Sequence, residues 1–274
     1  GINTAKDAIG GWVTKQYQKG KHPDFFKNFF ELTQDQGLNH ECHQVTTEDG
    51  YQLSLFRIKD PKTPEGAQLF HVAGLLGSAE NWVANGHKSA AFILAKRGYD
   101  VWCGNHRGTK YSRKHETLNP DTDQEFWQFS FPEMGDYDMP ASIDFAEEDR
   151  VIKSSVHWPL SGDHLDVSRT CYKVRLLERE ISVFIAFAPV IIPNKDNLLF
   201  NVGSQLEAVL EKRLAAAGIW ELMGANWDNT EKTVRVLVPS YSAATLTSFT
   251  LVESNDREQA KAFLGHFPHG ASVR

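Results

Sequence analysis

The chain has 274 residues, 41% of them hydrophobic, which is enough to bury the core of one α/β domain with an inserted or appended subdomain. Its formal net charge of -6 and pI of about 6.0 argue against a nucleic-acid partner, because phosphate binding needs a clustered basic surface. Its cysteines, Cys42, Cys103 and Cys171, are too few and too widely spaced for a disulfide scaffold and contain no Cys-x-x-Cys metal or redox pair.

The first predicted elements are a helix and a hairpin. Residues Asp24 to Leu32 carry a Phe-Phe doublet that repeats four residues on, which predicts a docking helix. Glu48-Asp49-Gly50 has turn chemistry, and the alternation of apolar and polar residues from Tyr51 to Ile58 indicates a strand. Together they predict a hairpin at the edge of a sheet.

A βαβ unit follows. Short apolar runs at Gln68 to Ala73 and Tyr99 to Gly104 flank Ser89 to Arg97, which has helical composition. A further run, Ile181 to Val190, is apolar at nearly every position, as expected for a strand covered by helices on both faces. We therefore expect an α/β fold in which these three strands are parallel neighbours of one sheet. The apolar run at this last strand is too short to span a bilayer, so no transmembrane segment is expected.

The chain beyond Pro193 has a different pattern. Apolar residues recur every four positions on one helical face and end at Gly218; they are Leu198, Val202, Leu206, Leu210 and Leu214. This pattern is typical of a helix packed on its own domain, and lipase lids, which contact lipid interfaces, have the same pattern. We predict a hydrolase-type core over residues 1–192 and a helical cap or lid region over residues 193–274.

A series of sequence phrases between Val45 and Phe145 resembles the eukaryotic acid lipases, the group of gastric and lysosomal acid lipases. The phrases are Thr47-Glu48-Asp49-Gly50-Tyr51, Gly74-Leu75-Leu76-Gly77-Ser78, Asn81-Trp82-Val83, Gly98-Tyr99-Asp100-Val101-Trp102, Gly104-Asn105-His106-Arg107-Gly108-Thr109, Tyr111-Ser112-Arg113-Lys114-His115 and Ile143-Asp144-Phe145. The resemblance resumes at Phe184-Ile185-Ala186-Phe187-Ala188-Pro189-Val190 and again at His266 to Val273, whereas residues 151–180 match nothing in the family. A set of this size is far more specific than one short motif.

This resemblance implies an α/β-hydrolase fold and hydrolysis of lipid esters through an acyl-serine intermediate, without a cofactor. The fold requires a serine on a tight strand-to-helix turn, flanked by small residues in a Gly-x-Ser-x-Gly pattern. That pattern is absent from the 274 residues. The nearest candidate is Leu160-Ser161, where Pro159 and Asp163 replace both glycines, so the nucleophile position is disrupted.

The rest of the triad is expected to be incomplete as well. The chain order of this fold is serine, acid, histidine, and the histidines after Ser161 are His164, His266 and His269. None of them has the context of the family's catalytic base, and the resemblance implies that the acid and base lie beyond Arg274. As written, the chain is predicted to be inactive.

One catalytic element is expected to survive. The resemblance assigns the loop donor of the oxyanion hole to the backbone N–H of Leu75, since this fold takes one donor from the loop after its third strand. Ala73 replaces a family histidine there, which leaves the N–H in place. Gly74 is equally compatible with a turn that has no catalytic role.

Metal binding is not expected. His40, His43 and His71 lack a nearby set of cysteines or carboxylates at metal-ligand spacing, so solvated or packed histidines are favoured.

Residues 157–167 are also compatible with an acid-lipase elbow that has been translated one base out of frame. Read one base later, the codons of Trp158 and Pro159 must encode glycine, and those of residues 157–167 permit Ile-Gly-His-Ser-Gln-Gly-Thr-Thr-x-Met. This is the acid-lipase elbow, with its serine between Leu160 and Ser161. An unrelated loop insertion is the alternative. It would have to reproduce the forced glycine and the compatible codons by accident, and also to explain why the apolar strand expected before the elbow is replaced by Lys153 to Pro159.

Three functional hypotheses remain open: a damaged acid-lipase-like ester hydrolase, a non-catalytic protein that binds lipid or a partner through the remaining pocket, and a gene-model or splice artefact without a stable product. The first implies a lipid ester substrate or acyl ligand. The family suggests a secreted or lysosomal location, but the chain begins at Gly1 without a signal-peptide pattern and has no Asn-x-Ser/Thr sequon.

Overall fold

The computed structural model describes residues 23–64, 66–72, 74, 77–148, 157–161, 183–187, 213, 216, 220–222 and 271–272. The α-helices are α2 (Phe29–Gln34), α3 (Ala90–Lys96), α4 (Phe131–Glu133) and α5 (Met139–Glu148). Short 3-10 helices are η1 (Pro23–Phe26), η2 (Ala79–Trp82), η3 (Gly86–Lys88) and η4 (Gln124–Trp127), and η5 (Met134–Asp138) is a π-helix. The strands are β1 (Asn39–Thr46), β2 (Gln52–Lys59), β3 (Gln68–Val72), β4 (Asp100–Gly104), β5 (His157–Ser161), β6 (Val183–Phe187), β7 (Glu221–Leu222) and β8 (Ala271–Ser272).

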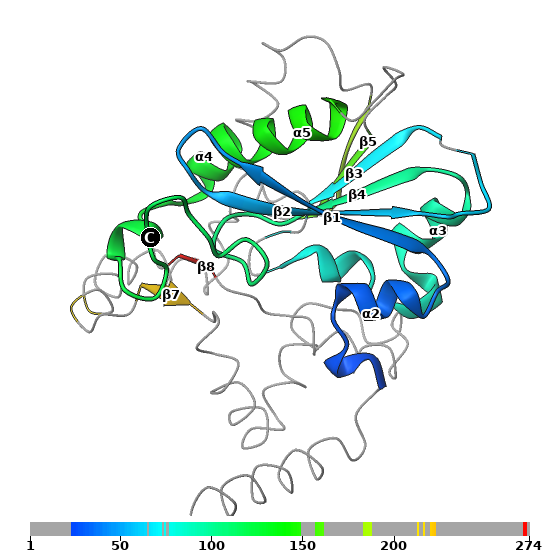
Figure 1. Ribbon diagram of the computed structural model, residues 1–274, viewed down its shortest axis with the longest axis horizontal. Coiled ribbons are helices and arrows are strands. Elements are labelled where there is room, and N and C mark those ends of the chain that lie inside the picture. Colours follow the sequence, from blue (N-terminus) through cyan, green and yellow to red (C-terminus); the bar gives the residue numbers. More distant parts are fainter. Residues whose placement is uncertain are drawn as a thin grey trace, which may run out of the picture.

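Six strands form one mixed sheet in the order β1-β2-β4-β3-β5-β6 (Figure 1). The first two form an antiparallel hairpin, β2 pairs antiparallel with β4, and the pairs β4-β3, β3-β5 and β5-β6 are all parallel. The predicted edge hairpin and the βαβ unit are thus confirmed, and the fold is the predicted α/β-hydrolase type.

The predicted neighbour of the Ile181–Val190 strand was wrong. That segment forms β6, parallel to β3 and β4 in the same sheet, but β5 lies between it and β3. Lys153 to Pro159 had been expected to replace the apolar strand before the elbow, but the structure has a strand there, β5, which begins at His157. The β3-β5 ladder pairs Leu69 with His157 and Val72 with Leu160, so it has no partner at Pro159, which lacks the N–H a ladder needs.

The predicted single helix from Asp24 to Leu32 is interrupted. It consists of η1 and α2, because Asn28 caps the second helix: its side chain accepts hydrogen bonds from the N–H groups of Phe30 and Glu31. The Glu31 carboxylate in turn accepts from the Asn28 N–H at 2.8 Å, which completes a capping box. Because Asn28 caps the start of α2 within the apolar pattern, the predicted helix is divided into two.

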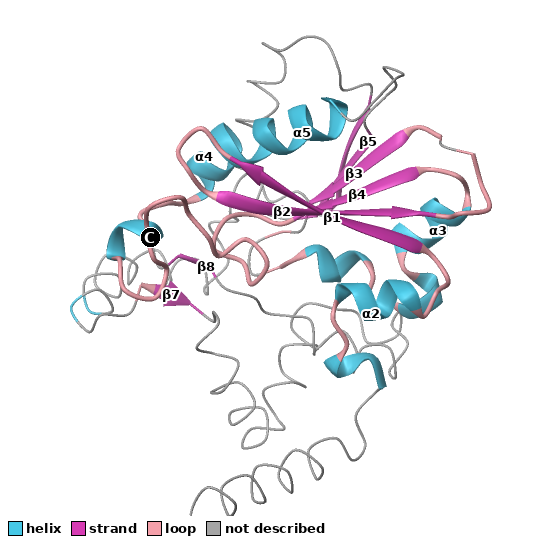
Figure 2. Cartoon of the chain, in the orientation of Figure 1, coloured by secondary structure: helices cyan, strands magenta, loops and turns pink. Residues whose placement is uncertain are grey.

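Helices cover both faces of the sheet, with α5 on one side and α2 and α3 on the other (Figures 1 and 2). The face toward α2 and α3 buries Phe56, Ile58, Val101 and Cys103 from the strands against Phe29 and Phe92 from the helices. The face toward α5 buries Leu55, Phe70, Val72 and Trp102 against Met139 and Ile143. This alternation follows from the strand geometry, since successive side chains point to opposite faces.

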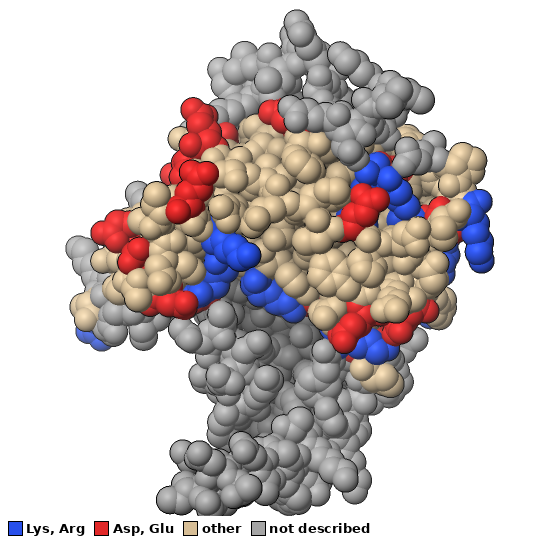
Figure 3. Space-filling view, in the orientation of Figure 1, with Lys and Arg blue, Asp and Glu red and all other residues tan. Residues whose placement is uncertain are grey.

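The predicted boundary at Pro193 and the amphipathic run from Leu198 to Leu214 lie outside the described residues, apart from isolated positions. Of the predicted cap region, the structure places β7 and β8, which form a two-stranded antiparallel ribbon. Among the described helices, none is long and apolar enough to cross a membrane. On the face shown in Figure 3, acidic and basic side chains lie in small separate groups.

Candidate active site

The site is built at the carboxyl edge of the parallel strands. Because β3, β4, β5 and β6 run in the same direction, their carboxyl ends, Val72, Gly104, Ser161 and Phe187, lie at one edge of the sheet. Loops that leave this edge carry the ligand-binding and reacting groups in open α/β sheets. The loop after β3 contains the predicted oxyanion donor, Leu75, and both this loop and the loop after β4 contain phrases that resemble the acid lipases.

The loop after β3 reverses direction between two glycines. The Gly77 N–H donates to the Gly74 carbonyl at 2.8 Å, and Ser78 then caps η2 by accepting a hydrogen bond from the Glu80 N–H. The predicted oxyanion donor, Leu75, lies between these glycines and outside the described residues, as does Ala73. Its assignment stays a prediction.

Asn105, the first residue after β4, connects this loop to the sheet. Its side-chain oxygen accepts from the Ala79 N–H at 2.9 Å, and its side-chain nitrogen donates to the Ser54 carbonyl on β2, also at 2.9 Å. The Ser112 hydroxyl donates to the Asn105 carbonyl at 2.9 Å. The start of η2 is thereby fixed relative to β2 and the loop after β4.

A buried carboxylate strengthens the same junction. The side chain of Glu80 is fully buried, with Lys110 Nζ 2.7 Å from its Oε1 and a hydrogen bond donated by the Tyr111 hydroxyl. Burial, together with this carboxylate, raises the pKa of the Tyr111 hydroxyl well above its ordinary value. Because a buried carboxylate is costly without partners, loss of either contact should loosen the junction.

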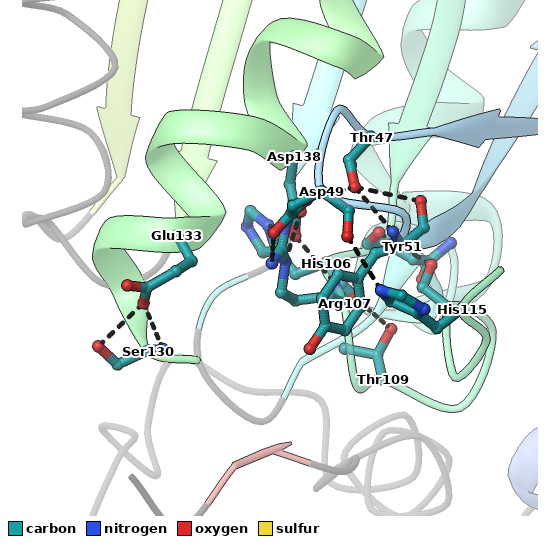
Figure 4. Close-up of polar contacts among 12 residues, drawn as sticks. Thr47, Asp49, Tyr51, His106, Arg107, Thr109, His115, Ser130, Glu133 and Asp138 are labelled. Carbon is teal, nitrogen blue, oxygen red and sulfur yellow. Dashed lines mark hydrogen bonds and ion pairs between the residues drawn. The ribbon is translucent and has the colours of Figure 1, made fainter. Parts of the chain in front are cut away.

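Arg107 forms the centre of a second polar cluster, shown in Figure 4. Its guanidinium donates to both carboxylate oxygens of Asp49 at 2.6 and 2.9 Å and to Asp138 Oδ1 at 2.7 Å. Its backbone N–H donates to Asp138 Oδ2 at 2.9 Å, and its guanidinium lies 3.9 Å from the centre of the Tyr51 ring. One side chain thus joins the β1-β2 turn, the loop after β4 and the π-helix.

The charges of this cluster stabilise one another. Burial raises the pKa of the Asp49 carboxyl, but the hydrogen bonds from Arg107 and Thr47 and the charge of Arg107 together outweigh it, so the net pKa is lowered. Burial lowers the pKa of the Arg107 guanidinium, while Asp138 and Asp49 raise it to a net value above its ordinary one. The pKa of the Tyr51 hydroxyl is raised to about 12, mainly by burial. Each guanidinium nitrogen of Arg107 and each carboxylate oxygen of Asp49 and Asp138 already has a hydrogen-bond partner within the cluster, so the cluster is a scaffold for the loops.

The predicted nucleophile position, Leu160-Ser161, lies at the carboxyl end of β5. By register, Leu160 is opposite Val72 and Ser161 is opposite Phe187. The position is therefore next to the end of β3, where the loop that contains Leu75 begins, and at the carboxyl edge of the parallel strands. His164, His266 and His269 lie outside the described residues, so their role stays a prediction.

The histidines considered as metal ligands are separate from one another. His40 packs on Phe30 with ring centres 5.0 Å apart, and His43 bonds Glu41 at 3.0 Å. His71 is fully buried on β3 against Trp82, at 4.5 Å between ring centres. Within the part of the chain that the structure describes, no three metal-ligating side chains come together.

Sequence reasoning missed the structural roles of Asn105, Arg107 and Glu80. Asn105 and Arg107 belong to a family phrase, and an arginine between a strand and a glycine was an available signal for a buried role. The partners Asp49 and Asp138 are far from Arg107 in sequence, so no local pattern identifies them.

Comparison with known proteins places the chain among lipases. Residues 29–86 match the family model described as the partial alpha/beta-hydrolase lipase region. The gastric triacylglycerol lipase of Bos taurus is 37% identical over 188 residues, covering 66% of this chain and 47% of that protein. The gastric triacylglycerol lipase of Rattus norvegicus is 30% identical over 265 residues, covering 92% of this chain and 66% of that protein. The chain belongs to the acid lipase family.

Solved structures of other proteins share the fold. A solved structure from Sulfolobus solfataricus, provisionally named a lipase, has a TM-score of 0.55 and 13% identity, over 86% of this chain and 73% of that chain. At this identity the likeness shows the fold alone. The chain spans between about half and two thirds of the length of the two gastric lipases.

Proposed function

We propose that this acid lipase family member is a lipase-like carboxylic-ester hydrolase scaffold that, with the residues it carries, does not turn over acyl esters. The observation that carries the proposal is the position of β5. In the order β1-β2-β4-β3-β5-β6, its carboxyl end is where an α/β-hydrolase raises its nucleophilic serine. Here that end carries Pro159-Leu160-Ser161-Gly162-Asp163 in place of Gly-x-Ser-x-Gly.

The chemistry of the elbow explains the expected loss. The serine hydroxyl must sit on a tight turn so that a histidine can take its proton and backbone N–H groups can hold the oxyanion. Small residues two positions before and after the serine allow the strand and helix backbones to approach each other. Pro159 and Asp163 each add side-chain atoms near that approach, and neither reproduces the glycine pattern.

The substrate class follows from the relatives. Two of them are named gastric triacylglycerol lipases, and another is named lysosomal acid lipase/cholesteryl ester hydrolase. We therefore propose a lipid ester, or its acyl product, as the ligand. The acyl-serine mechanism needs no metal or cofactor. Contact with a lipid surface through the predicted lid pattern is part of the same proposal.

The experiment that tests the proposal is an activity assay of the full chain on a short p-nitrophenyl ester and on emulsified triacylglycerol. We expect hydrolysis at the background rate and no labelling by a serine-reactive fluorophosphonate. Hydrolysis that Ser161→Ala abolishes and the nearby Ser155→Ala leaves unchanged would overturn the proposal.

Non-catalytic binding is the second candidate, favoured by the same disrupted elbow on an otherwise packed core. It predicts that a fluorescent fatty acid binds to the chain in a saturable manner and is recovered unchanged. Absence of saturable binding in correctly folded protein would count against it.

A further inference from the structure

The ribbon formed by β7 and β8 lies against the long loop between β4 and α4 (Figure 1). Its two strands come from distant parts of the chain: Glu221 pairs with Ser272, and Leu222 pairs with Ala271. Both strands belong to the predicted cap region, whereas the loop after β4 belongs to the predicted core. The ribbon is therefore a described contact between these two regions.

Arg113 makes the main polar connection. Its Nε donates to Glu221 Oε1 at 3.0 Å, and its NH2 group donates to Glu221 Oε2 at 2.9 Å, so the guanidinium and the carboxylate form a two-pronged pair. On the core side, NH1 donates to Asp121 at 2.8 Å and NH2 donates to the Pro120 carbonyl at 3.3 Å. One guanidinium thus bonds the ribbon and the core loop at once.

The second strand of the ribbon has its own attachment. The Ser272 hydroxyl donates to the Trp127 carbonyl at 2.6 Å. The indole ring of Trp127 also lies 5.4 Å from the Arg113 guanidinium, and its Nε1 donates to the Pro120 carbonyl at 2.9 Å. Beside the first strand, Trp220 packs on an aromatic cluster of the core that includes Phe126 and Phe129. Polar and apolar contacts therefore meet at the same point.

The two ion pairs of Arg113, with Glu221 and with Asp121, differ in how deeply they are buried. The side chains of Arg113 and Glu221 are only 11% and 10% exposed, so little solvent screens their attraction. Asp121, which bonds the same guanidinium, has a side chain that is 62% exposed, and exposed pairs of this kind add little. Burial lowers the pKa of the Arg113 guanidinium, and Glu221 and Asp121 raise it to a net value above its ordinary one. The ribbon-side pair should dominate.

We propose that Arg113 is a positioning residue that anchors the predicted cap region to the hydrolase core, by holding the β7-β8 ribbon against the loop after β4. Because both strands are held, Leu222 and Ala271, the two ends of the segment between the strands, are fixed at one point on the core. Arg113 lies in the loop after β4, which begins at Asn105, so this point is fixed relative to the carboxyl edge of the parallel strands. The inference rests on the proposed cap assignment, but its test measures the ribbon alone and does not depend on turnover.

The test is a double-mutant cycle on the full chain with Arg113→Ala, Glu221→Gln and the double variant. Hydrogen exchange of the amides at residues 221, 222, 271 and 272 measures opening of the ribbon, and urea unfolding measures the core. We expect each single change to speed exchange at the ribbon by roughly tenfold or more, because a charged hydrogen-bonded pair is lost. The double variant should exchange no faster than the single variants, because both remove the same interaction.

Two matched variants complete the design. Asp121→Asn removes the exposed partner of the same guanidinium and should leave ribbon exchange within about twofold of the unmodified protein. Arg113→Lys keeps the charge but lacks the planar fork, so it should restore ribbon protection only in part. Additive effects in the double variant, equal acceleration by Asp121→Asn, or acceleration of the whole core together with the ribbon would each overturn the proposal.

Discussion

The buried imidazole of His71 should make this fold less stable as the pH falls. His71 lies on β3 with no exposed surface, and neither of its ring nitrogens has a hydrogen-bond partner among the residues that the structure describes. Burial lowers its pKa to about 3, because the charged imidazolium would lose its hydration without gaining a partner. The neutral imidazole is the form that the folded protein accepts.

The direction of the effect follows from proton binding. An unfolded chain takes up a proton on this histidine below a pH of about 6.5, whereas the folded protein does so only near pH 3. The unfolded state therefore binds more protons between these values, and the free energy of unfolding decreases as the pH falls from about 6.5 toward 3. The slope approaches about 1.4 kcal/mol per pH unit once the pH is well below 6.5, so acidification from pH 6.5 to pH 4.5 should cost roughly 2 kcal/mol at this residue alone.

The assay is urea unfolding of the protein and of His71→Leu at several pH values from 7.5 to about 4. Leucine fills a similar volume without polar atoms, so the variant should lose less stability on acidification, and the two curves should separate by about 1.4 kcal/mol per pH unit. The exposed His40→Leu is the matched control and should follow the unmodified protein. Parallel curves for the protein and His71→Leu would refute the reasoning, because they would mean that His71 protonates equally in both states.

Two further predictions concern a turn and the nucleophile position. Gly50 has φ +93°, and an added Cβ would lie 2.9 Å from the His115 ring, whereas Gly37 has φ +69° and open space around it. Urea unfolding should show a loss of about 1 to 2 kcal/mol for Gly37→Ala, from backbone strain alone, and a clearly larger loss for Gly50→Ala; equal losses would show that His115 yields freely. Sequencing of the source DNA should find Gly-His-Ser-Gln-Gly one base out of frame across the codons for Trp158 to Asp163, and any other sequence there would make the loss of the elbow a true substitution.

The parts of the fold that depend on local pattern could be predicted from sequence. The hairpin was predicted because Gly50 marks its turn and the residues from Tyr51 to Ile58 alternate, and the βαβ unit because two short apolar runs, now β3 and β4, flank a segment of helical composition, now α3. The helix near Phe29 was predicted too long, since the capping role of Asn28 competes with the apolar pattern around it. β5 was missed because its strand has no apolar run and contains Pro159.

The polar scaffold of the site could not be predicted in this way. Arg107 takes its partners from the β1-β2 turn and from the π-helix, and Arg113 takes Glu221 from a segment far along the chain. Such pairs depend on which loops the sheet order brings to the same edge. The family phrases located these arginines, but only the packed chain identifies the carboxylates that they bind.

At residues 157–163 the requirements of the fold differ from those of the chemistry. A strand needs backbone pairing, and β5 retains it: five residues pair with β6, and the ladder to β3 has partners on either side of Pro159. An elbow needs more, because its serine must sit on a strained turn where flanking side chains obstruct the backbones. Pro159 is compatible with the backbone pairing of β5, and Asp163 follows the strand. Both residues, however, conflict with the small residues that the elbow requires. The sheet can therefore keep the position of the nucleophile without the residues that would make it reactive, as in the hydrolase scaffold without turnover that we propose.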